Sequence, residues 1–293
     1  MRTLFIFAAA AIAVPACAQT APAAPGTPYR AGTTVTSAAT GISFTVPDGF
    51  EGAWDDDAQG IVLSNGAGLT IGIWGVSAGT IDGVADEIGG LLASIGLQLT
   101  LAEEPRRGDL TTALFHAQSA QERGYLVAAM RQAPSGAILA VGVLGADQGI
   151  LRSTGEALAR GAHFGDAEAA QWAARAAGLQ LAGRDGGSTS SRGGVGDAYN
   201  VSRTEAELTL CRSQEYSYQS RSTSSMSVAG VGDAESNSSD AHRGQWSLLG
   251  DLVGRALLSL ESTDGRSFLW SVEETENGAV INGFRYEATP GPC

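Results

Sequence analysis

Apolar and polar residues follow two different periods along residues 41–165. Every second residue is apolar over 42–46, and two further apolar runs meet at Asn65-Gly66, a dipeptide that accepts the positive φ angles of a tight hairpin. Apolar residues recur at three- and four-residue spacing over 81–95 and again over about 147–160, which predicts two amphipathic helices. This order of strands and helices is typical of an α+β fold, so we expect an antiparallel sheet with helices on one face.

A second pattern, of short alternating runs separated by turn residues, fills residues 206–293. The Asn282-Gly283 pair, between Ile281 and Phe284, is a strong hairpin signal within it. The pattern predicts a separate small all-β domain, either a meander or a barrel-like sheet.

Gly- and Ser-rich segments lie between and within these halves. Residues 166–205 combine a short helical stretch with a run that contains few large apolar residues, which predicts a helix followed by a flexible linker. The stretches "STSSRGGVGDA" (188–198) and "STSSMSVAGVGDA" (222–234) resemble each other and consist of small, mostly polar residues. We interpret both as flexible loops, because two short copies are too few for a repeat architecture.

The beginning of the chain has the features of an export signal. Residues 1–18 contain one Arg, a short apolar run and a small-residue cleavage site that ends at Ala18, as in a secretory signal peptide. The alternative is a lipoprotein signal, in which Cys17 becomes the lipidated first residue. Residues 19–40 are rich in Ala, Pro, Gly and Thr and predict a disordered tether.

Composition and charge narrow the possible functions. The formal net charge is −13, and an acidic chain repels nucleic acids and anionic lipid surfaces. No later apolar run is long enough for a transmembrane span. All 18 basic residues are Arg, which excludes the Schiff-base, P-loop, kinase and Ser-Lys chemistries that need a lysine. The sequence indicates no cofactor.

Signal cleavage leaves two cysteines, Cys211 and Cys293. An even pair in an exported chain predicts a disulfide, because oxidising compartments form and keep such bonds. Two unpaired thiols are the alternative. Together with the signal peptide, the pair predicts a periplasmic or secreted protein, or one anchored through a lipidated Cys17.

One motif matches a hydrolase nucleophile. The stretch "GVSAG" (75–79) places Ser77 between a predicted strand and a predicted helix, the context in which a tight turn exposes a nucleophilic hydroxyl. His163 is a candidate base with Asp109 or Asp147 as its partner, and His242 is the other candidate base, with a later aspartate as its partner. The preceding strands form a hairpin and no oxyanion segment is present, so a strand-to-helix turn is the preferred interpretation.

The sequence offers little for a metal ion. The three histidines do not cluster, and zinc spacings such as H-x-x-x-H and C-x-x-C are absent. The predicted loop at 233–242 contains Asp233, Glu235 and Asp240, whose oxygen ligands suit calcium, although the EF-hand spacing fails. These residues are weak calcium candidates.

Two resemblances add to this picture. The segment "GISFTVPDGF" (41–50), the hairpin, the helix and the closing helix with "HF" resemble a PsbP/DcrB-type α+β domain. The ordered features "LC", "YSYQS", "GQW", "LSL", "DGR" and "INGFRY" resemble a small uncharacterised β module found at the C-termini of exported bacterial proteins. The first resemblance implies an accessory or interaction role without catalytic residues, and the second implies an exported context.

Together these features predict a non-catalytic exported protein of two small domains that binds an envelope protein or a surface component. A serine hydrolase that uses Ser77 is one alternative. The other alternative is a carrier that holds a small apolar molecule in the β domain, and its candidate residues are Trp246, Leu258, Leu260, Phe268 and Trp270.

Overall fold

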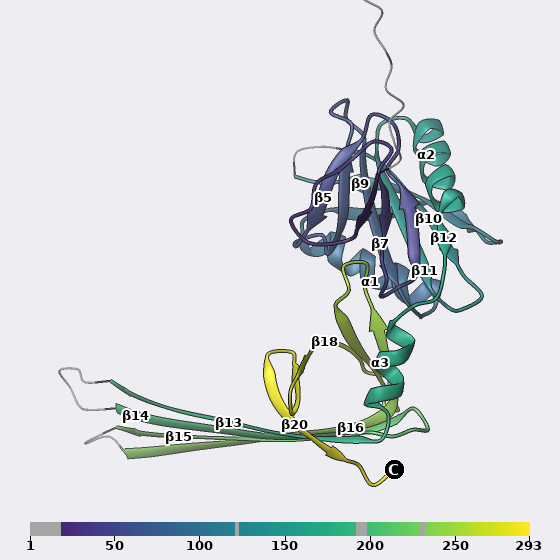
Figure 1. Cartoon of the computed structure of the whole chain (residues 1–293). Helices are drawn as coiled ribbons and strands as arrows, with labels where there is room; N and C mark the ends of the chain where they lie inside the picture. Colours follow the sequence, from purple (N-terminus) through teal and green to yellow (C-terminus); the bar gives the residue numbers. More distant parts are fainter. Residues whose placement is uncertain (1–18, 121–122, 192–197, 229–231) are drawn as a thin grey trace, which may run out of the picture.

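The computed structural model describes residues 19–120, 123–191, 198–228 and 232–293 (Figure 1). An α+β domain with antiparallel sheets is followed by a closed barrel of eight antiparallel strands. The predicted α+β class and the separate all-β domain are therefore confirmed. The predicted signal peptide over 1–18, including Cys17, lies outside the described residues.

The first domain is built on one large sheet and one small sheet. The eight-stranded sheet has the order β2 (Tyr29–Arg30), β5 (Glu51–Asp55), β6 (Gly60–Ser64), β7 (Thr70–Val76), β11 (Ile138–Gly145), β10 (Arg123–Gln132), β9 (Thr111–Gln118) and β8 (Gln98–Arg106). The four-stranded sheet has the order β1 (Thr20–Pro22), β3 (Thr34–Thr36), β4 (Ile42–Thr45) and β12 (His163–Phe164). All neighbouring strands are antiparallel except β1 and β3, which are parallel.

The tether predicted over 19–40 is wrong, because β1, β2 and β3 lie within it. Tyr29 and Val35 are completely or almost completely buried, and both belong to the main core of the first domain. A segment with few apolar residues cannot form a core by itself, but here two side chains anchor it to a core that other strands supply.

The two predicted helices are present as α1 (Ile81–Ser94) and α2 (Gln148–Gly161). Their first turns are capped, because the Thr80 side chain accepts the Gly83 N–H and Asp147 accepts the N–H groups of the first turn of α2. Helix α1 follows β7, and helix α2 follows β11, another strand of the large sheet.

The helices lie on opposite faces of the large sheet, which differs from the predicted single face. Leu151 of α2 shares a core with Val127, whereas Leu92 of α1 shares a core with Leu126. Because successive strand residues point to opposite faces, both faces of the sheet are buried. The small sheet also packs on the α2 side, where Phe44 joins the same core as Leu151.

The second domain closes eight strands into a barrel. In order these are β13 (Leu179–Ser191), β14 (Ala198–Leu210), β15 (Glu215–Val228), β16 (Gly232–Gly250), β17 (Ala256–Ser262), β18 (Ser267–Thr275), β19 (Gly278–Ile281) and β20 (Phe284–Pro290). The barrel closes where β20 pairs with β13. Helix α3 (Ala169–Ala176) precedes it and packs alanine side chains against its core.

Four strands continue far beyond this closed part (Figure 1). We call the extension the arm; it consists of residues 184–191, 198–205, 221–228 and 232–239, which pair row by row. The linker predicted over 166–205 is therefore wrong at residues 179–191 and 198–205, and residues 188–191, 198, 222–228 and 232–234 of the two predicted loops are strand. The rest of these loops, residues 192–197 and 229–231, lies outside the described residues. Small polar residues can continue a strand here because the barrel sets the register and neighbouring strands satisfy the backbone.

The two domains are docked through the connection between β16 and β17. The Ser77 N–H donates to the Gly250 carbonyl at 3.0 Å, and the Gly250 N–H donates to Ser77 Oγ at 2.9 Å. Leu252 is buried in the main core of the first domain, and the Arg255 guanidinium lies 4.9 Å from the centre of the Trp54 ring. The barrel therefore contributes residues to the core of its neighbour.

Candidate functional site

A cavity of about 870 Å³ lies where α3 meets the barrel. Its apolar wall includes Leu179, Leu181, Leu210, Leu248, Leu258 and Ile281 from the strands, and Trp172 and Ala176 contribute from α3. A volume of this size is typical of sites that hold a small molecule.

Several residues of this wall remain half-buried although they belong to the barrel core or pack against it. Leu248 and Val272 pack against that core without being fully buried, whereas Leu208 and Leu260 in the same core have no exposed surface. Small barrels are usually filled by their own side chains. The barrel interior is therefore filled in one part and left open beside α3.

Charged residues surround the opening of the cavity. Arg175 of α3 pairs with Glu274 at 3.4 Å, and Arg255 pairs with Asp251 at 2.6 Å. Glu276 also lines the cavity and forms no ion pair within the described part of the chain, whereas Glu273 follows the inward-facing Val272 on β18 and belongs to the outer face of that strand. The opening therefore carries an excess of negative charge.

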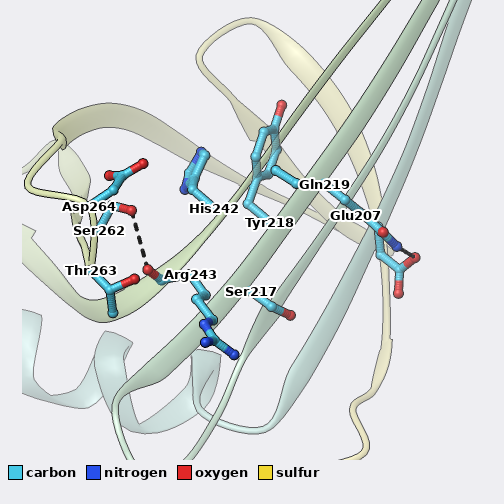
Figure 2. A pocket seen from close by; sticks show the side chains of 10 residues that line it. Glu207, Ser217, Tyr218, Gln219, His242, Arg243, Ser262, Thr263 and Asp264 are labelled. Atoms are coloured by element: carbon cyan, nitrogen blue, oxygen red, sulfur yellow. Dashed lines mark hydrogen bonds between the residues drawn. The ribbon is translucent and has the colours of Figure 1, made fainter.

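Aromatic side chains fill another part of the barrel, and Figure 2 shows two of the residues in this part, Tyr218 and His242. His242 stacks on Phe268 with ring centres 4.5 Å apart, and Tyr218 meets the edge of Trp270 at 5.2 Å. Burial and the neighbouring Tyr218 raise the pKa of Tyr286. Trp246 is also buried there, and its indole N–H donates to the Cys211 carbonyl at 2.9 Å. Most of the carrier residues suggested by the sequence are thus occupied in packing.

His242 is a buried polar residue within this cluster. Its Nδ1 is 2.8 Å from the Tyr216 hydroxyl, and its Nε2 has no hydrogen-bond partner among the described residues. The Asp240 carboxylate lies 3.9 Å from Nε2, which is too far for a hydrogen bond. Burial lowers the pKa of His242 and therefore favours the neutral imidazole.

A shallow polar pocket of about 450 Å³ lies beside His242, and Figure 2 shows the residues around it. His242 and Tyr218 extend to one side of the sheet, whereas Arg243 and Ser217 extend to the other. This follows from the alternation of side chains along a strand. The polar groups around this pocket therefore do not converge on one point.

Ser77 occupies the predicted turn between a strand and a helix, since β7 ends at Val76 and α1 begins at Ile81. Its side chain is buried, with 8% exposure, and its Oγ accepts the Gly250 N–H at the domain junction. The sheet around it is antiparallel, unlike the mostly parallel sheet of a nucleophile elbow.

The other members of the suggested triad lie elsewhere. His163 lies on β12 and His242 lies in the barrel, and within the described residues neither hydrogen-bonds to Ser77. Asp147 caps α2, and Asp109 lies 3.8 Å from Arg160. The structure therefore brings no base to Ser77 in the part of the chain that it describes.

The weak calcium candidates lie on strand β16 rather than in a loop. Glu235 and Asp240 are five residues apart on this strand, so they belong to opposite faces. Asp240 pairs with Arg266 at 3.2 Å, and the side chain of Asp233 lies outside the described residues. Within the described residues no group of three metal-ligating side chains is present.

The predicted disulfide between Cys211 and Cys293 is present. It ties the end of the chain to the connection between β14 and β15 and indicates an oxidising compartment. In the described part of the chain, no helix is long and apolar enough to cross a membrane.

The comparisons with known proteins add no relative. No family model matches the chain, and the searches of curated proteins and of solved structures also give no match. The resemblances to a PsbP/DcrB-type domain and to an exported β module therefore stay predictions.

Sequence reasoning missed the two most distinctive features of the second domain, the arm and the cavity beside α3. One signal was present: Leu179 and Leu181 alternate with polar or small residues directly after the short helix. This alternation marks the inward face of β13, which begins within the segment predicted as a helix and linker. No comparable signal marks the arm, whose residues are mostly small or polar.

Proposed function

We propose that this chain is a non-catalytic exported interaction protein that binds an extended segment of an envelope protein along its arm. The observation that carries the proposal is the pairing of the arm's outer strands. β16 pairs with β17 only from Gly244 onward, and β13 pairs with β20 only as far as Gly183. In the described part of the chain, each strand therefore has a long edge without a neighbour.

Such edges suit recognition by strand addition. The backbone N–H and C=O groups along an unpaired edge can bond to an added strand, and side-chain pockets are not needed for affinity. Proteins usually shorten or cover such edges, because they also invite aggregation. The long unpaired edges lie on strands whose described side chains form no core in the arm. This supports a binding role for the edges.

The charge of the β16 edge favours a basic segment over a second copy of this chain. Residues 232–239 contain Asp233 and Glu235 and no basic residue. Pairing two copies of this edge would bring like charges together, whereas Arg or Lys in a partner strand would complement them.

A photo-reactive amino acid at Asn237, on the edge strand, tests the proposal in the native host. Thr223, its paired neighbour on the inner strand β15, is the matched control position. We expect Asn237 to give one discrete adduct whose cross-linked peptide is extended and basic, and Thr223 to give much less of it. The partner protein identified from this adduct should bind the full chain when it is purified. Glu235→Lys should weaken this binding more than Glu104→Lys on the first domain does.

Equal cross-linking from both positions, or a partner whose binding ignores the Glu235 charge, would argue against the arm as the binding surface. A fluorophosphonate probe separates this proposal from the hydrolase alternative. We expect no adduct on Ser77, because its hydroxyl is buried at the domain junction. A labelled Ser77 would instead favour the enzyme.

A second candidate function is carriage of a small apolar molecule by the barrel. The cavity beside α3 favours it, because its apolar wall is left partly exposed to solvent. The arm and the cavity are different surfaces, so the two functions are testable separately.

A further inference from the structure

The cavity beside α3 combines an apolar wall with a polar opening. Leu181 and Leu258 form the buried part of the wall, and Leu179, Leu248 and Val272 leave apolar surface open to the cavity. Burying this surface against an apolar molecule is favourable, in rough proportion to the area removed from water. The wall therefore specifies an apolar body for the ligand.

The opening specifies the charge of the ligand's end group. Arg175 and Arg255 are each paired with a carboxylate, Glu274 and Asp251 respectively. Glu276 is exposed at the opening and has no ion pair within the described residues. A ligand carboxylate would meet uncompensated negative charge, whereas an ammonium group would meet a carboxylate without a cationic partner.

We propose that this cavity binds an apolar molecule with a single cationic end group, of the alkylammonium class. The alkyl body lies against the barrel leucines, and the ammonium group lies at the opening near Glu276. The proposal rests on the second candidate function, the carrier, and is independent of strand addition at the arm.

Helix α3 takes part in the site and supplies a reporter. Trp172 and Ala176 line the cavity, and the Arg175–Glu274 pair joins the helix to β18. A bound alkyl chain would lie against the Trp172 indole and change its fluorescence. The chain contains five Trp residues, so Trp172→Phe identifies which part of the change comes from α3.

Titration of the full-length protein with decylamine, decanol and decanoate at neutral pH tests the ligand class, because the three probes share one chain length and differ in head charge. We expect saturable binding of decylamine at a ratio of one to one, at least about tenfold tighter than that of decanoate, with decanol between them. The preference should weaken in salt, because the carboxylates are exposed.

Two variants locate the site. Glu276→Gln changes only an exposed side chain and should remove most of the preference for decylamine over decanol, whereas Glu273→Gln, on the outer face of β18, should leave this preference unchanged. Ala256→Phe fills the cavity and should abolish binding of all three probes, whereas Ser259→Phe, on the opposite face of the same strand, should leave binding unchanged.

The outcomes test separately the charge of the ligand and the use of the cavity as a binding site. Decanoate binding as tightly as decylamine, or a decylamine preference that survives Glu276→Gln, overturns the cationic class while leaving a carrier. Absence of saturable binding by any probe, or binding that Ala256→Phe does not change, overturns the cavity as a site and the carrier function with it. Neither result affects cross-linking from Asn237.

Discussion

The arm is formed by four of the eight strands of the closed barrel, yet the barrel and the arm differ in almost every other respect. Leu208 on β14 and Leu260 on β17 are fully buried in the barrel, whereas the arm consists largely of small and polar residues, and its Met226 is 47% exposed. Strand pairing therefore continues well past the point where a core ends. The barrel supplies the stability, and the arm is free to present its edges.

The forces that hold the arm are mainly backbone hydrogen bonds in register with the barrel. One hydroxyl pair, Thr204 with Ser222, bridges two of its strands at 3.1 Å, and ion pairs such as Arg184 with Glu205 are exposed. Exposed pairs contribute about 0–1 kcal/mol each. The arm therefore depends on the barrel for its order, and side-chain changes should cost much more in the barrel than in the arm.

Removing the disulfide should have the largest effect on the stability of the barrel. Cys211 and Cys293 are 82 residues apart, and closing a loop of that length stabilises the folded state by about 4 kcal/mol in the chain-entropy account. We expect Cys211→Ser with Cys293→Ser to lower the free energy of unfolding of the barrel by roughly this amount, measured by urea unfolding. Reduction of the unmodified protein should give the same loss. A loss below about 1 kcal/mol would mean that the barrel does not depend on its covalent closure.

Two substitutions on one strand compare the barrel and the arm directly. Leu208→Ala should cost about 3 kcal/mol, because a fully buried leucine leaves a cavity. Ser202→Ala, six residues earlier on β14 and on the same face, should change stability by less than about 0.5 kcal/mol. Thermal and urea unfolding of both variants measure the difference. Similar costs at the two positions would show that the arm has a core of its own.

The same contrast explains what could be predicted from the sequence. Alternation of apolar residues identified the strands around Phe44 and Leu260, and the three- and four-residue stripe identified α1. The arm could not be identified in this way, because none of the described side chains on its strands is buried and its residues are typical of linkers. Its order comes from register with the barrel, which is a long-range property.

The candidate site was predictable only in part. The disulfide could be predicted because two cysteines remain in a chain with an export signal, and the turn at Ser77 could be predicted from its glycines. The cavity did not follow, because it depends on how far the barrel side chains fill the space and on where α3 lies. The carrier residues proposed from the sequence included Trp246 and Trp270, which pack in the aromatic part of the barrel instead.

A smaller effect is expected where the barrel docks on the first domain. Ser77→Ala leaves the Gly250 N–H without its hydroxyl acceptor in a buried place, which should cost about 1–3 kcal/mol. Hydrogen exchange at Gly250 and the urea midpoint measure the loss. Ser94→Ala, at an exposed hydroxyl near the end of α1, is the control and should have little effect. An unchanged exchange rate at Gly250 would argue that this contact does not contribute to docking.

The smallest expected effect is a pH dependence that belongs to the barrel and not to the arm. Burial lowers the pKa of His242 below its ordinary value of 6.5, so the unfolded chain binds the proton more readily than the folded barrel does. Stability should therefore fall as the pH drops below about 6.5, and it should be fully retained at higher pH.

Urea unfolding between pH 5 and pH 8 measures this slope, and His242→Phe should flatten it. The variant also removes the partner of the Tyr216 hydroxyl, so its stability is lower at every pH and only the slope decides the test. His163→Gln, at an exposed position on β12, should leave the slope unchanged. A slope that persists without the His242 imidazole would place the titrating group elsewhere and would remove the barrel interior as the source of the acid sensitivity.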